Sequence, residues 1–141
     1  ELVKEQNVIF GEVNVTFPYN ESNIIFNEGW LEQVNSEKYR WVRQESEFQI
    51  GLSNQTKITM LGYLPEGFKE ITNVKLYLND KLIADENIFD GQEITLQGEL
   101  SKGRIEGNNV FKIVFDGEHI PNKEAEDQRS FSAMFSSIKI E

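Results

Sequence analysis

The chain has 141 residues, of which 38% are hydrophobic and 27% charged, and its 24 acidic residues against 14 basic ones give a net charge of −10. This length suits one domain with one core, and the composition excludes a disordered tail. The negative charge repels phosphate backbones and so argues against nucleic acid as a partner. Because the sequence has no cysteine, disulfides, thiolate nucleophiles and cysteine-bound metals are excluded.

The sequence also bounds the domain organisation. No run approaches the roughly 20 apolar residues that span a bilayer, so no direct membrane insertion is expected in this segment. The sequence begins at Glu1 rather than at a methionine, which favours the interpretation that it is an excised part of a longer protein. We therefore expect residues 1–141 to form a single domain that is a module of a longer protein.

Alternation of apolar and polar residues predicts short strands through the first half of the chain. The pattern is strict over 48–52, and a turn at 53–55 then leads to a returning strand, as in a hairpin. Residues 30–43 have no clear period, and we expect a loop that leads into a short strand. The strands expected in this half are 8–17, 24–26, a short one near Trp41, 48–52 and 58–62.

The second half contains the clearest hairpin signal. Asn79-Asp80 separates two apolar runs and suits a tight turn. Ile94, Leu96 and Leu100 mark a weaker strand. Residues 110–115 are almost continuously apolar, which predicts a central strand covered on both faces.

The C-terminal strand has a break in its pattern. Phe131 and Phe135 share one face, whereas Ile138 and Ile140 have the opposite parity. A straight strand would turn one of these pairs to water. A β-bulge at 136–137 restores the phase by adding one residue, so we expect a bulge there.

These patterns predict an all-β fold, an antiparallel two-sheet β-sandwich of jelly-roll or immunoglobulin-like type with about eight or nine strands. No amphipathic helix of ordinary length is evident, which disfavours a parallel α/β fold.

Nothing in the sequence forms a catalytic signature. The only histidine, His119, lacks the partners of a nucleophilic triad or a zinc site, and a solvated loop histidine is the simpler interpretation. A glycosidase would need two converging carboxylates, and the acidic run 118–127 could supply oxygen ligands to calcium. A solvated acidic loop is the simpler interpretation of the run, so we expect no enzyme activity, no cofactor and no metal.

The candidate ligand-binding residues are Trp30, Tyr39, Arg40 and Trp41. Flat aromatic rings offer apolar faces to the C–H groups of sugars, and neighbouring polar groups can bind the hydroxyls. Trp30 stands beside the turn residue Gly29 and is expected to be exposed. Trp41 has a second interpretation as a core tryptophan between two sheets.

A structural ion pair is expected near the last strand. Asp127 and Arg129 are its candidate residues, with Arg40 as the other possible partner of the carboxylate. Such a pair would close the edge of the sandwich.

The order of several short motifs resembles non-catalytic β-sandwich modules associated with bacterial glycosyltransferases and cell-envelope polysaccharide proteins. The resemblance covers roughly residues 26–140, and it departs from the usual pattern at 131–133, where a more aliphatic start to the last strand is common. The motifs are Gly29-Trp30, Tyr39-Arg40-Trp41, Asn79-Asp80-Lys81, Gly107-Asn108-Asn109 and Asp127-x-Arg129.

The resemblance and the aromatic residues together predict a non-catalytic accessory module that binds polysaccharide or oligosaccharide and accompanies other domains of a bacterial cell-envelope glycan-processing protein. Its expected location is extracytoplasmic or at the cell surface, with the cytoplasmic face of the membrane as the alternative. A second hypothesis is a structural or protein-interaction domain of an extracytoplasmic or membrane-anchored surface protein.

Overall fold

The computed structural model describes residues 11–19, 23–120 and 130–141. Within these residues no helix has the length and apolar character needed to cross a membrane. The described residues form ten strands, against the eight or nine expected, and the short 3-10 helix η2 (Leu100–Lys102). The strands are β1 (Val13–Thr16), β2 (Ile24–Phe26), β3 (Arg40–Val42), β4 (Glu45–Leu52), β5 (Lys57–Tyr63), β6 (Asn73–Leu78), β7 (Lys81–Asn87), β8 (Glu93–Glu99), β9 (Gly107–Phe115) and β10 (Ala133–Ile140).

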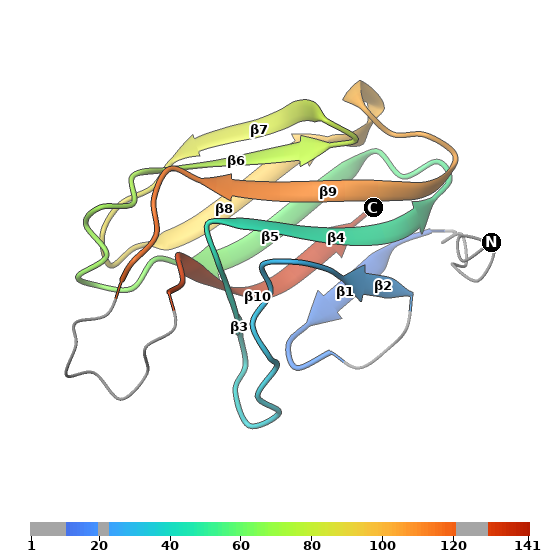
Figure 1. The fold of residues 1–141 in the computed structure, drawn as a ribbon. Helices are drawn as coiled ribbons and strands as arrows, with labels where there is room; N and C mark the ends of the chain where they lie inside the picture. The colour runs from blue at the N-terminus through green and yellow to red at the C-terminus, as the bar shows by residue number, and fades with distance from the viewer. Residues whose placement is uncertain (1–10, 20–22, 121–129) are drawn as a thin grey trace.

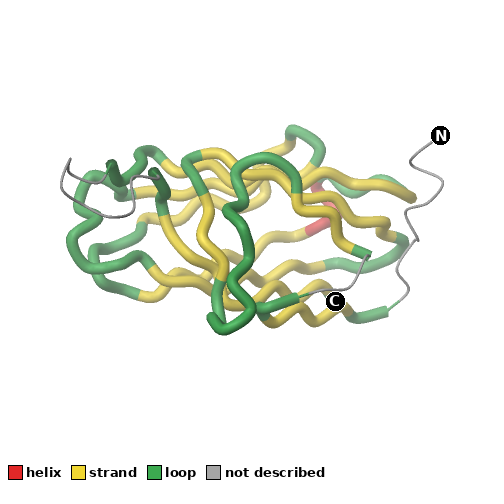
Figure 2. Tube along the Cα trace, turned by 60° about the horizontal axis from the view of Figure 1, so that its bottom comes forward, coloured by secondary structure: helices red, strands yellow, loops and turns green. Residues whose placement is uncertain are grey.

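The strands form two antiparallel sheets that face each other as two layers (Figures 1 and 2). The β9 sheet has the order β2-β4-β9-β6-β7. The β10 sheet has the order β1-β10-β5-β8. Strand β3 also pairs with β10, at residues 133–135, whereas β1 pairs with residues 137–140. The predicted two-sheet β-sandwich is therefore confirmed.

The core lies between the sheets and is filled by alternate residues of most strands. Strand β8 shows this most simply, because Ile94 and Leu96 are buried while the residues between them are exposed. The strand ends at Glu99, one residue earlier than expected, and Leu100 instead begins η2 and is also buried. Each large apolar side chain buried in this way contributes roughly 1.5–3 kcal/mol to folding.

Strand β10 changes phase at a single residue. Its pairing with β5 passes over Ser136, which is the extra residue of a β-bulge. Phe135 is buried before the bulge, and Ile138 and Ile140 are buried after it. The predicted bulge is confirmed, and it lets both halves of the strand face the same core.

Two polar motifs of the sequence meet at the β6–β7 hairpin. Asn79 and Asp80 form its turn with positive φ angles of 48° and 69°, as the sequence predicts. The Asn79 side-chain amide donates to Oδ1 of Asn109 at 2.8 Å. Asn109, which is fully buried, also accepts from the Ile105 N–H at 2.9 Å and donates to the carbonyls of Ile105 and Gly107 at 2.8 and 2.7 Å. The two motifs therefore hold a hairpin against the loop that precedes β9.

The predicted hairpin between β4 and β5 is wrong, because these strands belong to different sheets. The residues between them carry the chain from one layer to the other. Gln55 is buried in this crossing and donates to the carbonyl of Gly11 at 3.0 Å, while the N–H of Thr56 donates to the carbonyl of Glu141 at 2.7 Å. Bonds to distant segments thus replace the ladder that a hairpin would have supplied.

The strand expected to be covered on both faces is packed on one side only, and an apolar edge strand behaves alike. Strand β9 is central in its sheet, yet Val110 and Val114 on its outer side remain partly exposed. Strand β2 is an edge strand, and its middle residue Ile25 is 45% exposed. In a two-layer antiparallel sandwich each sheet has one packed face, so a continuous apolar run does not imply burial on both.

We expect Asn109→Leu to lower the free energy of unfolding by about 2–4 kcal/mol, because a side chain of similar size leaves several buried polar groups without partners. Denaturation by guanidinium chloride measures this. Asn108→Ala is the control, since Asn108 is only partly buried, and its cost should stay below about 1 kcal/mol. Equal losses for the two variants would contradict the structural role of Asn109.

Candidate functional site

Strand pairing aligns four side chains across the outer side of the β10 sheet. Trp41 of β3 lies opposite Met134 of β10, Met134 lies opposite Tyr63 of β5, and Tyr63 lies opposite Glu93 of β8. Directly paired residues place their side chains on the same face of a sheet. We call these four residues the outer row. All four are partly or fully exposed.

A shallow pocket opens at the outer row. Its volume is about 200 Å³, smaller than the roughly 300–1,000 Å³ typical of enclosed ligand pockets. The surface therefore suits a ligand that lies across it rather than one that is engulfed. The pocket is lined by Tyr39, Gly62, Tyr63, Glu93, Met134 and the bulge residue Ser136.

Tyr39 forms one wall of this pocket and is supported by Trp41. Tyr39 directly precedes β3, and the rings of Tyr39 and Trp41 meet edge to face with centroids 5.9 Å apart at 90°. Trp41 also packs against Phe131 at 4.5 Å and Phe68 at 6.4 Å. Trp41 is consequently only partly exposed. Trp41 is therefore not a core tryptophan between the two sheets but packs against the core from outside, and its part in ligand binding stays a prediction.

The structure corrects the expectation that Trp30 is exposed: its side chain is 9% exposed and belongs to the core. Its ring lies 4.7 Å from that of Phe26 and 6.2 Å from that of Phe135. The reason lies in Gly29, which has a φ of 87° and where a Cβ would come within 2.5 Å of the Cα of Ser46. Gly29 packs against the β4 backbone and directs the next residue inward.

Arg40 points away from the outer row. Its guanidinium carbon lies 5.0 Å from the ring centroid of Phe26 and 5.7 Å from that of Trp30, and Nε donates to the carbonyl of Leu31 at 2.7 Å. Burial lowers the pKa of Arg40. These contacts give Arg40 a structural role as a cation held over aromatic rings.

The remaining residues named from the sequence are the candidate ion pair, the acidic run and the single histidine. Asp127 and Arg129 lie outside the described residues, as does 121–127 of the acidic run, so their ion pair stays a prediction. His119 is stacked on Phe68 with centroids 4.1 Å apart, rather than lying free in a solvated loop. In the described part of the chain, no group of three or more histidine and carboxylate side chains is placed to hold a metal ion.

Tyr63, Met134 and Glu93 were not predicted from the sequence. For Tyr63 a signal was present, because it continues the outward parity of Lys57 and Thr59 in its strand. For Met134 and Glu93 there was none, since their place beside Tyr63 depends on which strands pair.

Three other hollows on the described part of the surface have linings that suit a sugar less well. One, of about 360 Å³, is lined by Lys57, Ile83, Gln97, Gly98, Glu99 and Lys102, and another, of about 400 Å³, by Glu28, Gly29, Arg43, Gln44, Glu45 and Glu118. Neither lining includes an aromatic ring. A third, of about 230 Å³ on the outer side of the β9 sheet, has one tyrosine, Tyr77. Of these four hollows, only the pocket at the outer row is lined by two aromatic rings, those of Tyr39 and Tyr63.

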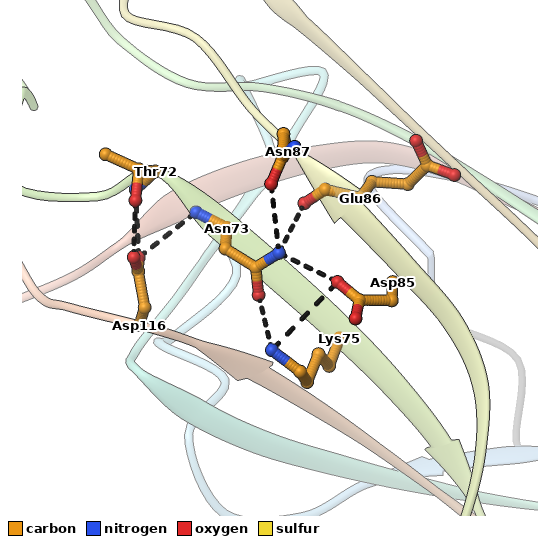
Figure 3. Close-up of polar contacts among 7 residues, drawn as sticks. All are labelled: Thr72, Asn73, Lys75, Asp85, Glu86, Asn87 and Asp116. Carbon is orange, nitrogen blue, oxygen red and sulfur yellow. Dashed lines mark hydrogen bonds and ion pairs between the residues drawn. The ribbon is translucent and has the colours of Figure 1, made fainter.

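A polar network at the start of β6 resembles a site but has a structural explanation (Figure 3). Asp116, just after β9, accepts hydrogen bonds from the Thr72 N–H and hydroxyl at 2.9 and 2.5 Å and from the Asn73 N–H at 3.2 Å. The Asn73 side chain donates to Asp85 at 2.8 Å and accepts from Lys75 at 2.8 Å. These groups bind one another and fasten the ends of three strands.

The comparisons with known proteins concern the fold. No protein-family model and no curated protein matches the sequence. Among solved structures the chain is similar to the CBM36-1 domain of a multidomain xylanase from the hindgut metagenome of Trinervitermes trinervoides, with a TM-score of 0.52 and 11% identity, covering 93% of this chain and 97% of that one. It is also similar to CBM35 from Cellvibrio japonicus Abf62, with a TM-score of 0.50 and 9% identity, covering 92% and 93%.

The abbreviation CBM stands for carbohydrate-binding module. The chain thus shares the β-sandwich fold of carbohydrate-binding modules. At identities of 9–11% the likeness extends to the fold and not to individual site residues.

The Asp116 network predicts a loss of stability in acid. Burial by itself raises the pKa of Asp116, but the hydrogen bonds from Thr72 and Asn73 outweigh it and lower the pKa below the ordinary 3.8. A folded-state pKa below the unfolded one contributes stability that is present above pH 3.8 and is lost as the pH falls through the folded value. We expect Asp116→Asn to be less stable at neutral pH and to show a shallower loss of stability in acid, measured by urea denaturation across this range. An unchanged acid slope would contradict the assignment.

We expect Arg40→Met to lower the free energy of unfolding by about 1–2 kcal/mol, because the variant loses the cation–π contacts and the bond to Leu31. Arg43→Met is the control, since the Arg43 side chain is 55% exposed and its pair with Glu118 contributes at most about 1 kcal/mol. Urea denaturation compares the two. A loss for Arg40→Met no larger than that for Arg43→Met would contradict the structural role.

Proposed function

We propose that the chain is a non-catalytic carbohydrate-binding module and that saccharide binds across the outer row. The observation that carries this proposal is the side-by-side placement of Tyr39, Met134 and Tyr63 around one shallow pocket on a sandwich of this fold. Met134 and Tyr63 lie on paired strands, so their backbone needs little ordering when a ligand binds. Trp41 supports the platform from its edge.

The polar groups at the pocket complement the rings. Tyr63 offers an apolar face to the C–H groups of a sugar, while Glu93 accepts hydrogen bonds from hydroxyls and Ser136 can donate or accept them. A chain of sugars can extend along the sheet because the surface is open. Trp30 and Arg40, which the sequence suggested as ligand-binding residues, have no direct part in this proposal.

The wider context is proposed from the motif resemblance: an accessory module of a bacterial cell-envelope glycan-processing protein, placed outside the cytoplasm and attached to further domains. The solved CBM36-1 domain comes from a multidomain xylanase, which supports the idea of a module that serves a larger protein. Without a catalytic group of its own, such a module would hold that protein near its polysaccharide.

The second candidate is a structural or protein-interaction domain of an extracytoplasmic or membrane-anchored surface protein. Burial of Trp30 favours it, because one of the two tryptophans is thereby withdrawn from any ligand surface. Exposed apolar side chains in loops also favour it, with Phe89 at 67% and Ile120 at 72% exposure. This candidate predicts that substitutions at the outer row leave the binding of the partner protein unaltered.

Tyr63→Ala should weaken retention on immobilised cell-wall and capsular polysaccharides by about tenfold, equivalent to about 1.4 kcal/mol of lost ring contact. Tyr77→Ala is the matched control, since Tyr77 lies partly buried on the outer side of the opposite sheet. Affinity electrophoresis measures retention for both variants. Failure of the domain to bind any polysaccharide, or an equal effect of the two substitutions, would favour the interaction domain.

A further inference from the structure

The pocket at the outer row has a one-sided charge. Among its lining residues, Glu93 is the only one that carries a formal charge. A second carboxylate stands at the pocket wall, where Glu37 accepts a hydrogen bond from the Tyr39 hydroxyl at 3.2 Å. The ligand surface is therefore bordered by carboxylates at Glu93 and at Glu37.

The lysines on the outer side of β5 and β10 lie too far away to balance these charges at physiological salt. Lys57 begins β5, six residues from Tyr63, which corresponds to about 20 Å along a strand. Lys139 lies roughly 15 Å along β10 from Met134, and its Nζ is 3.8 Å from a carboxylate oxygen of Glu12. Both distances exceed the ~8 Å over which exposed charges interact at physiological salt.

The two basic residues that flank Tyr39 in the sequence also do not line the pocket. Arg40 points to the other side of β3, with its guanidinium over the rings of Phe26 and Trp30. Lys38 precedes Tyr39 but is not a lining residue. The pKa of Tyr39 agrees with a negative surrounding, because burial raises it and the charge and hydrogen bond of Glu37 raise it further.

We infer that the outer row selects glycans by charge: it accepts uncharged and amine-bearing sugars and disfavours uronates and other anionic glycans. This inference rests on the proposed function and adds the ligand class. An ammonium group on a sugar ring over Tyr63 would lie within reach of the Glu93 carboxylate, which accepts its hydrogen bonds. A sugar carboxylate in the same position would meet a like charge, and the described residues that line the pocket include no lysine or arginine to offset it.

Three β-1,4-linked oligosaccharides of the gluco configuration test the selection: cellohexaose, the glucosamine hexamer and the glucuronic acid hexamer. Calorimetric titration of the whole chain should give the order glucosamine, then cellohexaose, then glucuronate, with neighbouring steps of about two- to fivefold in affinity. The steps should shrink as salt rises from about 0.01 to about 0.15 M, which shortens the screening length from ~30 to ~8 Å.

Glu93→Gln should abolish most of the preference for the glucosamine hexamer over cellohexaose. Glu99→Gln is the matched control, because it removes the same charge from the same side of β8, six residues away. If both variants lose the preference equally, net charge rather than the pocket causes it, and the inference is overturned.

The outcomes separate this inference from the proposed function. Binding of cellohexaose that needs Tyr63, together with equal or tighter binding of the glucuronate, overturns the charge selection and leaves the carbohydrate-binding proposal standing. Absence of Tyr63-dependent binding for all three oligosaccharides counts against both.

Discussion

The pairing of β10 with its neighbours is the constraint on which the rest of the structure depends. This strand pairs with β5 along one edge and with β3 and β1 along the other, so it fixes the position of three elements from distant parts of the chain. The bulge at Ser136 allows both halves of β10 to contribute to the core. Without it, either Phe135 or Ile138 would face water, and the outer row would lose its register.

The same constraint divides the aromatic residues into two sets. In β3, Trp41 lies on the outer side while Arg40 and Val42 face inward, and the ring of Tyr39, which directly precedes the strand, packs against that of Trp41. The inward set, which includes Trp30, joins the two sheets and stabilises the sandwich. The outward set belongs to the open surface that we propose as the saccharide site. Motifs adjacent in sequence thus serve different purposes on the two sides of one strand.

Much of the fold follows from local pattern, and the candidate site follows from it only in part. Period-two alternation predicted the strands, the parity change at Ser136 predicted the bulge, and Asn79-Asp80 predicted the hairpin turn. Burial of Trp30 could not be read locally, because Gly29 indicates a turn but not the strand against which the turn packs. Tyr63, Met134 and Glu93 come together through pairings between β5, β10 and β8, which the one-dimensional pattern does not specify.

The most direct test of the account is a comparison of the two indole N–H signals in a nitrogen–proton NMR spectrum, since the chain has only two tryptophans. Titration with cellohexaose and with the glucosamine hexamer should shift the signal of Trp41 and the backbone amides of residues 61–63 and 134–136. The signal of Trp30 should stay in place. Shifts confined to Trp30, or to loops and the outer side of the β9 sheet, would contradict the claim that the outer row is the binding surface.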